Sequence, residues 1–461
     1  METVQTNTMT TAVSDLAMDA TGLDDQASFE RHLSASTLPT VWKDWKIEFW
    51  RKFQDLPMPK SRDEHWRFSK RIDFELSSYQ LAEKPSEEVV AEAVKRSNVV
   101  GALSGRFIFV DNFLVHRDNL DEETLSRGVI FLPLEEAFEK HRDLVEQYLF
   151  QESTDLGSEK FHALHNAYSE TGYFLYVPKN VEIEKPFVVD HWQSAPGTAT
   201  FPHILVIGGE NSRFSVVDVH QSLFDDREGF GCSVGNVFAE SGARIFRKTV
   251  QNYNEKSVAF QLDTNNVDRD TSVRGINLNL GGRRSRFENE VRINGSGADV
   301  KLYSLTIAEN DQEFDQRTLQ IHNAPNAVSD LLYKNALMDH SRTIFSGLIK
   351  VAKDAQQTDA YQTNRNLLLN ETAQANSLPG LEIEANDVKC SHGATTGQLD
   401  REELFYFLQR GIPKTIAQQL MVFGFFEEVI EQFESAEMEE NLRELIREKF
   451  AKKQLQAVAS A

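Results

Sequence analysis

Ile276-Asn277-Leu278-Asn279-Leu280 alternates apolar and polar residues, and so does Val300-Lys301-Leu302-Tyr303-Ser304-Leu305. A period of two is typical of β-strands, because successive side chains of a strand point to opposite faces. Small and polar residues interrupt the runs, for example at Gly295-Ser296-Gly297-Ala298 and at Ala324-Pro325-Asn326-Ala327. This part of the chain therefore predicts short strands separated by tight turns.

The turns recur at a nearly constant spacing. Representative turn centres at residues 296, 325, 354 and 386 are 29, 29 and 32 residues apart. This spacing favours stacked coils of strand, turn, strand and turn, that is, a β-solenoid. No helical pattern separates the strands, which disfavours a sheet built from β-α-β units. Periodicity alone leaves an antiparallel sandwich open as the alternative.

The sequence divides into four segments. Residues 1–28 are polar and predict a mobile leader, residues 29–170 predict a mainly helical domain, and residues 171–399 predict the β core. Residues 400–461 return to helical spacing, and the mixed charges at 438–454 predict a solvated last segment. In the helical domain, aromatic residues spaced three and four apart lie on one helix face: Trp42, Trp45, Phe49, Trp50 and Phe53.

Composition excludes several classes of protein. The 461 residues include 49 Lys and Arg against 71 Asp and Glu, a net charge of −22, which disfavours nucleic acid or an anionic membrane as a partner. The N-terminus lacks the features of a signal peptide, and no apolar run is long enough to span a membrane. Two cysteines are too few for a disulfide-stapled secreted protein. We therefore expect a cytoplasmic protein.

Cys390 and His392 are the strongest candidates for chemistry. On a strand, residues two apart point to the same face, so this thiol and imidazole could share a metal ion or a sulfur atom. Two ligands do not complete a metal site, and the others would have to come from distant coils or another subunit. A buried, inert Cys390 remains an alternative. We expect Cys232 to be structural.

Two other clusters permit alternative functions. His162 and His165 lie three residues apart, and we expect an exposed pair rather than a metal site. Asp263, Asp268 and Asp270 could be the carboxylates of a solenoid enzyme acting on carbohydrate, although an acidic, solvated loop is favoured. A purely structural homodimer with an incidental thiol is a third hypothesis.

Several segments in order resemble the SufB/SufD family of iron-sulfur cluster assembly proteins. The resemblance is strong over residues 330–435 and continues through the helical segment at 404–412. The segments that carry it are Ser341-Arg342-Thr343-Ile344-Phe345-Ser346-Gly347, Asp354-Ala355-Gln356-Gln357-Thr358-Asp359-Ala360-Tyr361-Gln362, Asn366-Leu367-Leu368-Leu369 and Cys390-Ser391-His392-Gly393-Ala394-Thr395.

The resemblance implies a right-handed parallel β-helix between an N-terminal helical domain and a C-terminal helical tail. It also implies a non-catalytic assembly subunit in a cytosolic complex with the ATPase SufC. The pattern is closer to SufD than to SufB, because no cysteine lies between Tyr361 and Asn366 and because Gly393 follows His392 where SufB-like chains have glutamate. Pairing with a SufB-like paralogue then implies that Cys390 and His392 contribute to a site at the subunit interface.

The expected cargo of that site is iron, or a transient iron-sulfur cluster shared with the partner. The sequence identifies no flavin site, and the isolated chain could form a homodimer. We expect the C-terminal helices to bind the SufC-like ATPase. The candidates for that contact, or for packing of the tail, are Phe405, Phe407, Arg410, Phe423 and Phe425.

Overall fold

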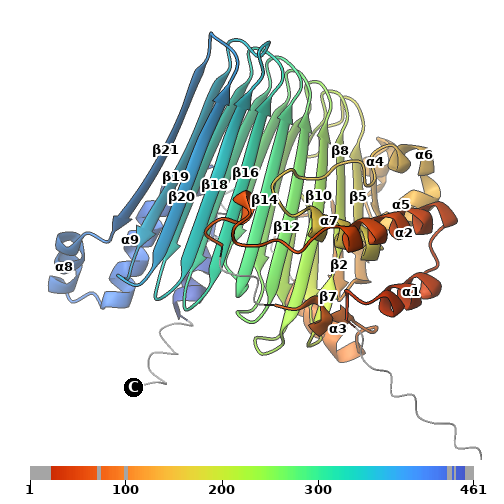
Figure 1. Ribbon diagram of the computed structural model, residues 1–461, viewed down its shortest axis with the longest axis horizontal. Helices are drawn as coiled ribbons and strands as arrows, with labels where there is room; N and C mark the ends of the chain where they lie inside the picture. The colour runs from red at the N-terminus through yellow and green to blue at the C-terminus, as the bar shows by residue number, and fades with distance from the viewer. Residues whose placement is uncertain (1–21, 70–73, 98–101, 433–438, 441–442, 452–461) are drawn as a thin grey trace, which may run out of the picture.

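The computed structural model describes residues 22–69, 74–97, 102–432, 439–440 and 443–451 (Figure 1). Most of the leader expected at residues 1–28 falls outside them. The described chain is a β-solenoid of long parallel strands, with helices packed around its first coils and on the outer face of its last coils. The β-helix expected from the sequence is confirmed.

The described strands form two sheets that face each other. One sheet has 11 strands and the other has 10. The 11-stranded sheet contains β20 (Gln374–Ile383), β18 (Arg342–Val351), β16 (Glu313–His322), β14 (Arg284–Ile293), β12 (Val258–Val267), β10 (Gly229–Ala239), β8 (Pro202–Gly208), β5 (Thr171–Val177), β4 (Ile130–Pro133), β7 (Thr198–Thr200) and β1 (Gln80–Leu81). The 10-stranded sheet contains β21 (Lys389–Gln398), β19 (Asp359–Leu368), β17 (Val328–Leu337), β15 (Asp299–Ala308), β13 (Ser272–Asn279), β11 (Arg244–Asn252), β9 (Arg213–Ser222), β6 (Phe187–Gln193), β2 (Gly105–Val110) and β3 (Phe113–Asp118).

The register explains the spacing of the turns. Arg284 pairs with Glu313, and Glu313 pairs with Arg342, so one coil takes 29 residues here. Every pairing from β5 to β21 within these sheets is parallel apart from the antiparallel pair that β5 makes with β4. The antiparallel sandwich that periodicity left open is therefore excluded.

Helices cover the outer face of the 11-stranded sheet at its first coils. The aromatic face expected on α2 is confirmed, because Trp42, Trp50 and Phe53 are buried. These side chains pack with residues of α1, α5 and α7 against β5, β8, β10 and β12. The helices of this region are α1 (Gln26–Ala35), α2 (Thr40–Asp55), α3 (Glu87–Arg96), α4 (Glu122–Ser126), α5 (Leu134–Lys140), α6 (Arg142–Glu146) and α7 (Glu159–Tyr168), with short 3-10 turns η1 (Glu64–Trp66) and η2 (Leu76–Ser78).

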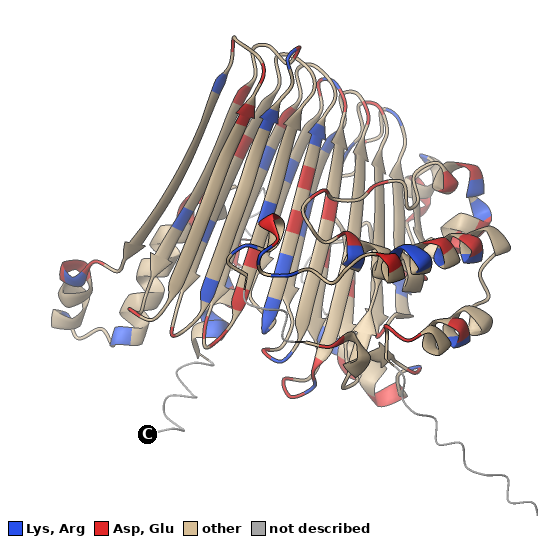
Figure 2. Cartoon of the chain, in the orientation of Figure 1, with Lys and Arg blue, Asp and Glu red and all other residues tan. Residues whose placement is uncertain are grey.

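Residues 64–69 and 152–158, here called the strap, lie across charged columns on β14 and β16 (Figure 2). The Arg286 guanidinium donates to the carbonyls of His65 and Leu156, at 2.9 and 2.7 Å, and lies 3.9 Å from the Trp66 ring. It also pairs with Asp315 at 2.5 Å. The strap therefore satisfies buried charges that would otherwise be costly on the outer face of a sheet.

Two of the three helical segments near the C-terminus pack on the outer face of the 10-stranded sheet. Asp400 caps α8 (Arg401–Gln409), Gly411 follows it with a φ of +77°, and Pro413 precedes α9 (Lys414–Ile430). Residues 443–451 are also helical, and Ile446 and Phe450 are buried against the same sheet. The solvated segment expected at 438–454 is therefore wrong for its described residues 443–451.

Among the described residues, no helix combines the length and the apolar character that a membrane crossing needs.

Candidate functional site

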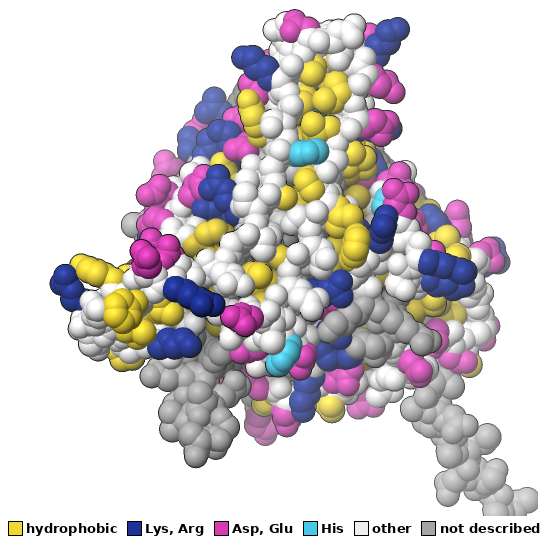
Figure 3. Space-filling model, turned by 60° about the vertical axis from the view of Figure 1, so that its left-hand side comes forward, with side chains coloured by type: hydrophobic (Ala, Val, Ile, Leu, Met, Phe, Trp, Pro, Cys, Tyr) yellow, Lys and Arg dark blue, Asp and Glu magenta, His cyan; other side chains and the backbone are white. Residues whose placement is uncertain are grey.

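The solenoid ends on two strands that each have a partner on one side only. Among the described strands, β20 pairs with β18 alone and β21 pairs with β19 alone. Figure 3 brings this end forward and shows apolar side chains along its middle, flanked by charged ones. An unpaired strand edge is a template for adding another strand, so this open end is a candidate interface.

Cys390 and His392 both lie on β21. In the register of β19 and β21, Cys390 is next to Ala360 and His392 is next to Gln362. Ala360 and Gln362 are fully buried between the sheets, so the two candidate side chains share the inward face of the last strand. The strand and the shared face expected from the spacing are present.

The two side chains have different surroundings. Cys390 is half-buried and packs beside an apolar cluster that includes Ala360 and Ala385, whereas His392 is exposed. Burial raises the pKa of the Cys390 thiol, the backbone N–H of Ala360 opposes this rise, and the charge of Asp359 adds to it. The thiol is therefore protonated at neutral pH, and a metal ion that binds it must displace the proton.

Cys232 lies in a different environment. It is fully buried on β10, and its Sγ donates a long hydrogen bond of 3.6 Å to the carbonyl of Phe161. Burial raises its pKa well above the usual value, and the charge of Glu288 adds to the rise. Cys232 is therefore a packing residue, as we expected.

The histidine pair predicted on the surface is buried. His162 is 3% exposed and His165 is fully buried on α7, where the helix packs against β10. His165 Nε2 lies 3.2 Å from Nδ1 of His203 on β8. The spacing placed the pair on one helix face, but it could not show that the solenoid covers that face. Burial lowers the pKa of His162 and of His203 to about 3, so these imidazoles are neutral.

The three aspartates of the carbohydrate-enzyme hypothesis do not converge. Asp263 lies inside the solenoid on β12, is 2% exposed, and pairs with Arg247 at 3.1 Å. Asp268 and Asp270 lie on the following turn and are exposed. The expected solvated loop is confirmed for these two and wrong for Asp263, and no carboxylate cleft joins them.

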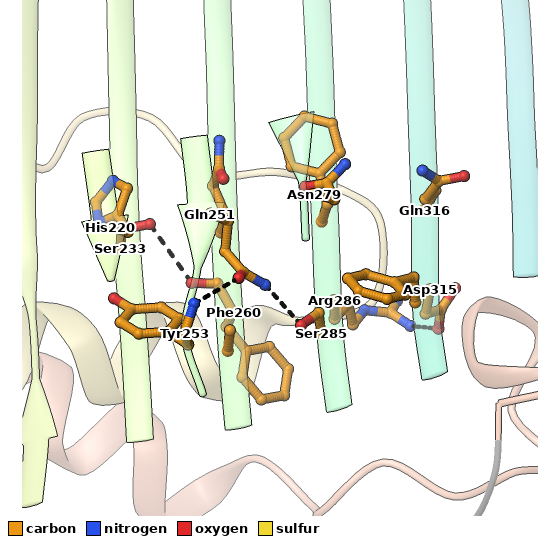
Figure 4. Close-up of a pocket in the computed structure, with 14 residues that line it drawn as sticks. His220, Ser233, Gln251, Tyr253, Phe260, Asn279, Ser285, Arg286, Asp315 and Gln316 are labelled. Carbon is orange, nitrogen blue, oxygen red and sulfur yellow. Dashed lines mark hydrogen bonds and ion pairs between the residues drawn. The ribbon is translucent and has the colours of Figure 1, made fainter. Parts of the chain in front are cut away.

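The interior of the solenoid holds a small polar cavity of about 20 Å³ (Figure 4). His220, Gln251, Asn279 and Ser285 are among its lining residues, and Gln251 Nε2 donates to the Ser285 hydroxyl at 2.7 Å. Such a volume holds about one water molecule. The cavity is therefore too small for a sugar or an organic cofactor.

The candidate residues of the tail divide into two groups. Phe423 and Phe425 on α9 pack against the apolar cluster of the 10-stranded sheet, whereas Phe405 on α8 is 58% exposed. Phe407 is partly exposed, and the exposed Arg410 lies over the Tyr406 ring at 4.7 Å. Helical spacing puts Ile416 and Leu420 on the apolar stripe of α9, and both are exposed, whereas sequence reasoning did not single out the exposed Tyr406 and Leu408 on α8.

No three His, Cys, Asp or Glu side chains gather closely enough to hold a metal ion within the part of the chain that the structure describes. Cys390 and His392 thus supply two donors of the kinds that bind iron and zinc. A complete metal site at this end would need further donors from outside the described residues.

Family models match almost the whole described chain. Residues 191–425 match the SUF system FeS cluster assembly, SufBD core domain, and residues 29–189 match the SufBD protein N-terminal region. The chain belongs to the SufBD family. The core model of this family spans the solenoid strands from β7 to β21, α8 and most of α9, so the open end and its two candidate residues lie within the matched domain.

Curated members of the SufBD family align over much of their lengths. The iron-sulfur cluster assembly protein SufD of Bacillus subtilis is 26% identical over 406 residues, covering 86% of this chain and 90% of the relative. SufD of Escherichia coli is 31% identical over 280 residues, 59% of this chain and 66% of the relative. A SufBD family protein of Mycobacterium tuberculosis is 30% identical over 276 residues, covering 58% and 68%. The chain is thus a SufD-like iron-sulfur cluster assembly protein.

Proposed function

We propose that this chain is a non-catalytic assembly subunit that pairs with a SufB-like paralogue through the open end of its solenoid. Cys390 and His392 would contribute a thiolate and an imidazole to a shared site where the two solenoids meet. The cargo of that site is iron or a nascent iron-sulfur cluster. The observation that carries the proposal is the position of both side chains on the inward face of the last strand, which has a described partner on one side only.

The chemistry of the open end supports a shared site. Two donors leave an iron ion with free coordination positions, and a partner that covers the edges of β20 and β21 could fill them. Covering the edges would also satisfy backbone groups that are open to water in the described chain. Since the Cys390 thiol is protonated when no metal is bound, cargo binding would release a proton at this site.

The C-terminal helices support a second contact, with a SufC-like ATPase. Helix α8 has no buried residue and exposes Phe405 and Tyr406, at 58% and 55%, whereas α9 buries one face against the sheet. An exposed aromatic pair on a helix that extends past the sheet is suited to docking in a groove of a partner. Movement of the ATPase could then open or close the shared site. We place this complex in the cytoplasm, where the two thiols stay reduced.

The test is reconstitution with SufB-like and SufC-like proteins of the same organism. The double variant Cys390→Ala with His392→Ala is expected to keep the complex intact on size exclusion and to lose cluster formation, followed by visible absorbance. A matched control is Cys232→Ala with His340→Ala, which changes one buried thiol and one exposed imidazole away from β21. Full cluster formation by the first double variant would refute the shared site.

The same purification tests the ATPase contact. Phe405→Ala with Tyr406→Ala is expected to release the ATPase while the SufB-like partner stays bound. Leu125→Ala, which removes a 53% exposed apolar side chain on α4, is the control and should retain both partners. Retention of the ATPase by the α8 variant would show that the contact lies elsewhere.

A further inference from the structure

Asn366 lies where the last strands of the two sheets meet. It belongs to one of the segments that carry the family resemblance, on β19, and is 4% exposed. Its side chain is part of a polar row that crosses the coils in register: Asn279, Thr306, Asn335, Asn366 and Thr396. Asn335 Nδ2 donates to Asn366 Oδ1 at 2.8 Å, so the amide is oriented by the coil beneath it.

The Asn366 amide contacts both terminal strands. Its Nδ2 lies 3.2 Å from the Ser377 hydroxyl on β20, and 3.2 and 3.3 Å from the Thr395 carbonyl and the Thr396 hydroxyl on β21. It also lies 2.9 Å from Asn364 Oδ1, to which Ser377 donates at 2.6 Å. The two N–H groups of the Asn366 amide are thus shared among four acceptors. Through them, Asn366 links β20 and β21, the last strand of each sheet, to β19.

Apart from its ladder with β19, β21 makes few contacts with the described residues. The ladder lies on one side only, and all side chains of the strand are exposed or half-buried. At Gly393 and Gly397, no described residue other than the glycine and its chain neighbours has an atom within 4 Å of the place where a Cβ would stand. An edge strand with few packing contacts opens easily, so each internal hydrogen bond contributes a large share of its order.

We propose that Asn366 is a positioning residue that fixes β21 against β20 and thereby sets the placement of Cys390 and His392 at the open end. Thr396, which the amide contacts, lies on the same inward face of β21 as the two donors, four residues beyond His392. A site that two subunits assemble needs its donors held before the partner arrives, because loose donors cost binding free energy. The role of Asn366 in placing Cys390 and His392 rests on the proposed function, whereas its anchoring of β21 does not.

Hydrogen exchange of the full chain tests the anchoring. Asn366→Ala and Asn366→Asp both remove the Nδ2 donor, and the second does so at nearly constant volume. We expect amides of residues 389–398 to exchange about tenfold faster in both variants, with residues 313–322 unchanged. Asn366→Thr, which supplies the hydroxyl found at positions 306 and 396 of the same row, should restore part of the protection.

Asn279→Ala is the matched control. It removes an amide from the same polar row, three coils further in, that donates to the hydroxyls of Ser304 and Thr306 on β15. It should leave the exchange of residues 389–398 close to that of the unchanged chain. Equal exchange of β21 in the Asn366→Ala variant and the unchanged chain, or the same increase from Asn279→Ala, would overturn the proposal.

The rate of cluster formation in the reconstituted complex tests whether Asn366 positions the two donors. Asn366→Ala should bind both partners and form clusters more slowly, and Asn366→Thr should recover part of the rate. Faster exchange of β21 with an unchanged rate would refute the role in positioning the donors. If the complex with Cys390→Ala and His392→Ala forms clusters as the unchanged complex does, the proposed function fails, while the exchange result still decides whether Asn366 anchors β21.

Discussion

The two ends of the solenoid are built from the same repeat and have opposite surroundings. On β12, near the beginning, nine of the ten residues are buried, whereas on β21, at the end, none is. Helices cover the outer face of the first coils, the strap covers β14 and β16, and no described element covers the last coil. The covered coils therefore stabilise this protein, and the uncovered coil is available for function.

The largest difference between the covered and uncovered coils is expected when a buried ion pair is broken. Arg286→Ala removes a 3% exposed guanidinium and leaves the carboxylates of Glu288 and Asp315 short of a partner under the strap. We expect it to lower the free energy of unfolding by about 3–5 kcal/mol, measured by urea unfolding. Arg401→Ala breaks an exposed pair with Glu371 next to the open end and should cost below about 0.5 kcal/mol. Equal losses of unfolding free energy in the two variants would contradict the difference between covered and uncovered coils.

The second-largest effect is expected from low pH, which should lower the stability of the covered first coils. Burial lowers the pKa of His203 on β8 to about 3, from the usual 6.5. Between these values the unfolded chain binds a proton that the folded chain excludes, so the stability contributed by this histidine falls as pH drops from about 6.5. At about pH 5 the loss is about 2 kcal/mol.

His203→Gln removes this titration. The variant should lose about 2 kcal/mol less than the unchanged chain when urea unfolding is compared at about pH 7 and about pH 5. His340→Gln, on an exposed turn, is the control and should follow the unchanged chain. The same pH dependence in His203→Gln and the unchanged chain would show that His203 is not held neutral by the fold.

The two thiols give the smallest effect and the simplest measurement. In the folded chain, Cys390 should react with an alkylating reagent and Cys232 should not, since only the first is accessible. Cys232→Ser should cost about 1 kcal/mol because it places a hydroxyl in an apolar cluster, and Cys390→Ser should cost less. Mass spectrometry of the labelled chain identifies the modified cysteine, and labelling of Cys232 in the folded state would contradict the comparison.

Local patterns predicted local structure well. Alternation identified the strands, the constant interval between turns identified the solenoid, and the spacing of Trp42, Trp50 and Phe53 identified the buried face of α2. Each of these signals depends on a few neighbouring residues and on backbone geometry. They therefore remain valid whatever packs against them.

Predictions of exposure failed where a distant element supplies the cover. His162 and His165 were expected on the surface, and the solenoid buries them. Residues 443–451 have mixed charges, yet Ile446 and Phe450 pack against the 10-stranded sheet. Asp263 was expected in a loop, and Arg247 from another strand pairs with it inside the solenoid. No local pattern encodes which segment lies opposite.

The sequence by itself determined the repeat and the spacing that puts the candidate residues Cys390 and His392 on one strand face, because strand alternation and coil length are properties of neighbouring residues. Only the tertiary structure decided that these donors lie on the inward face of the last strand and that the Asn366 amide joins β21 to β20. The physical reason is that burial and edge position depend on which coil comes next. After β21 no further coil follows among the described residues.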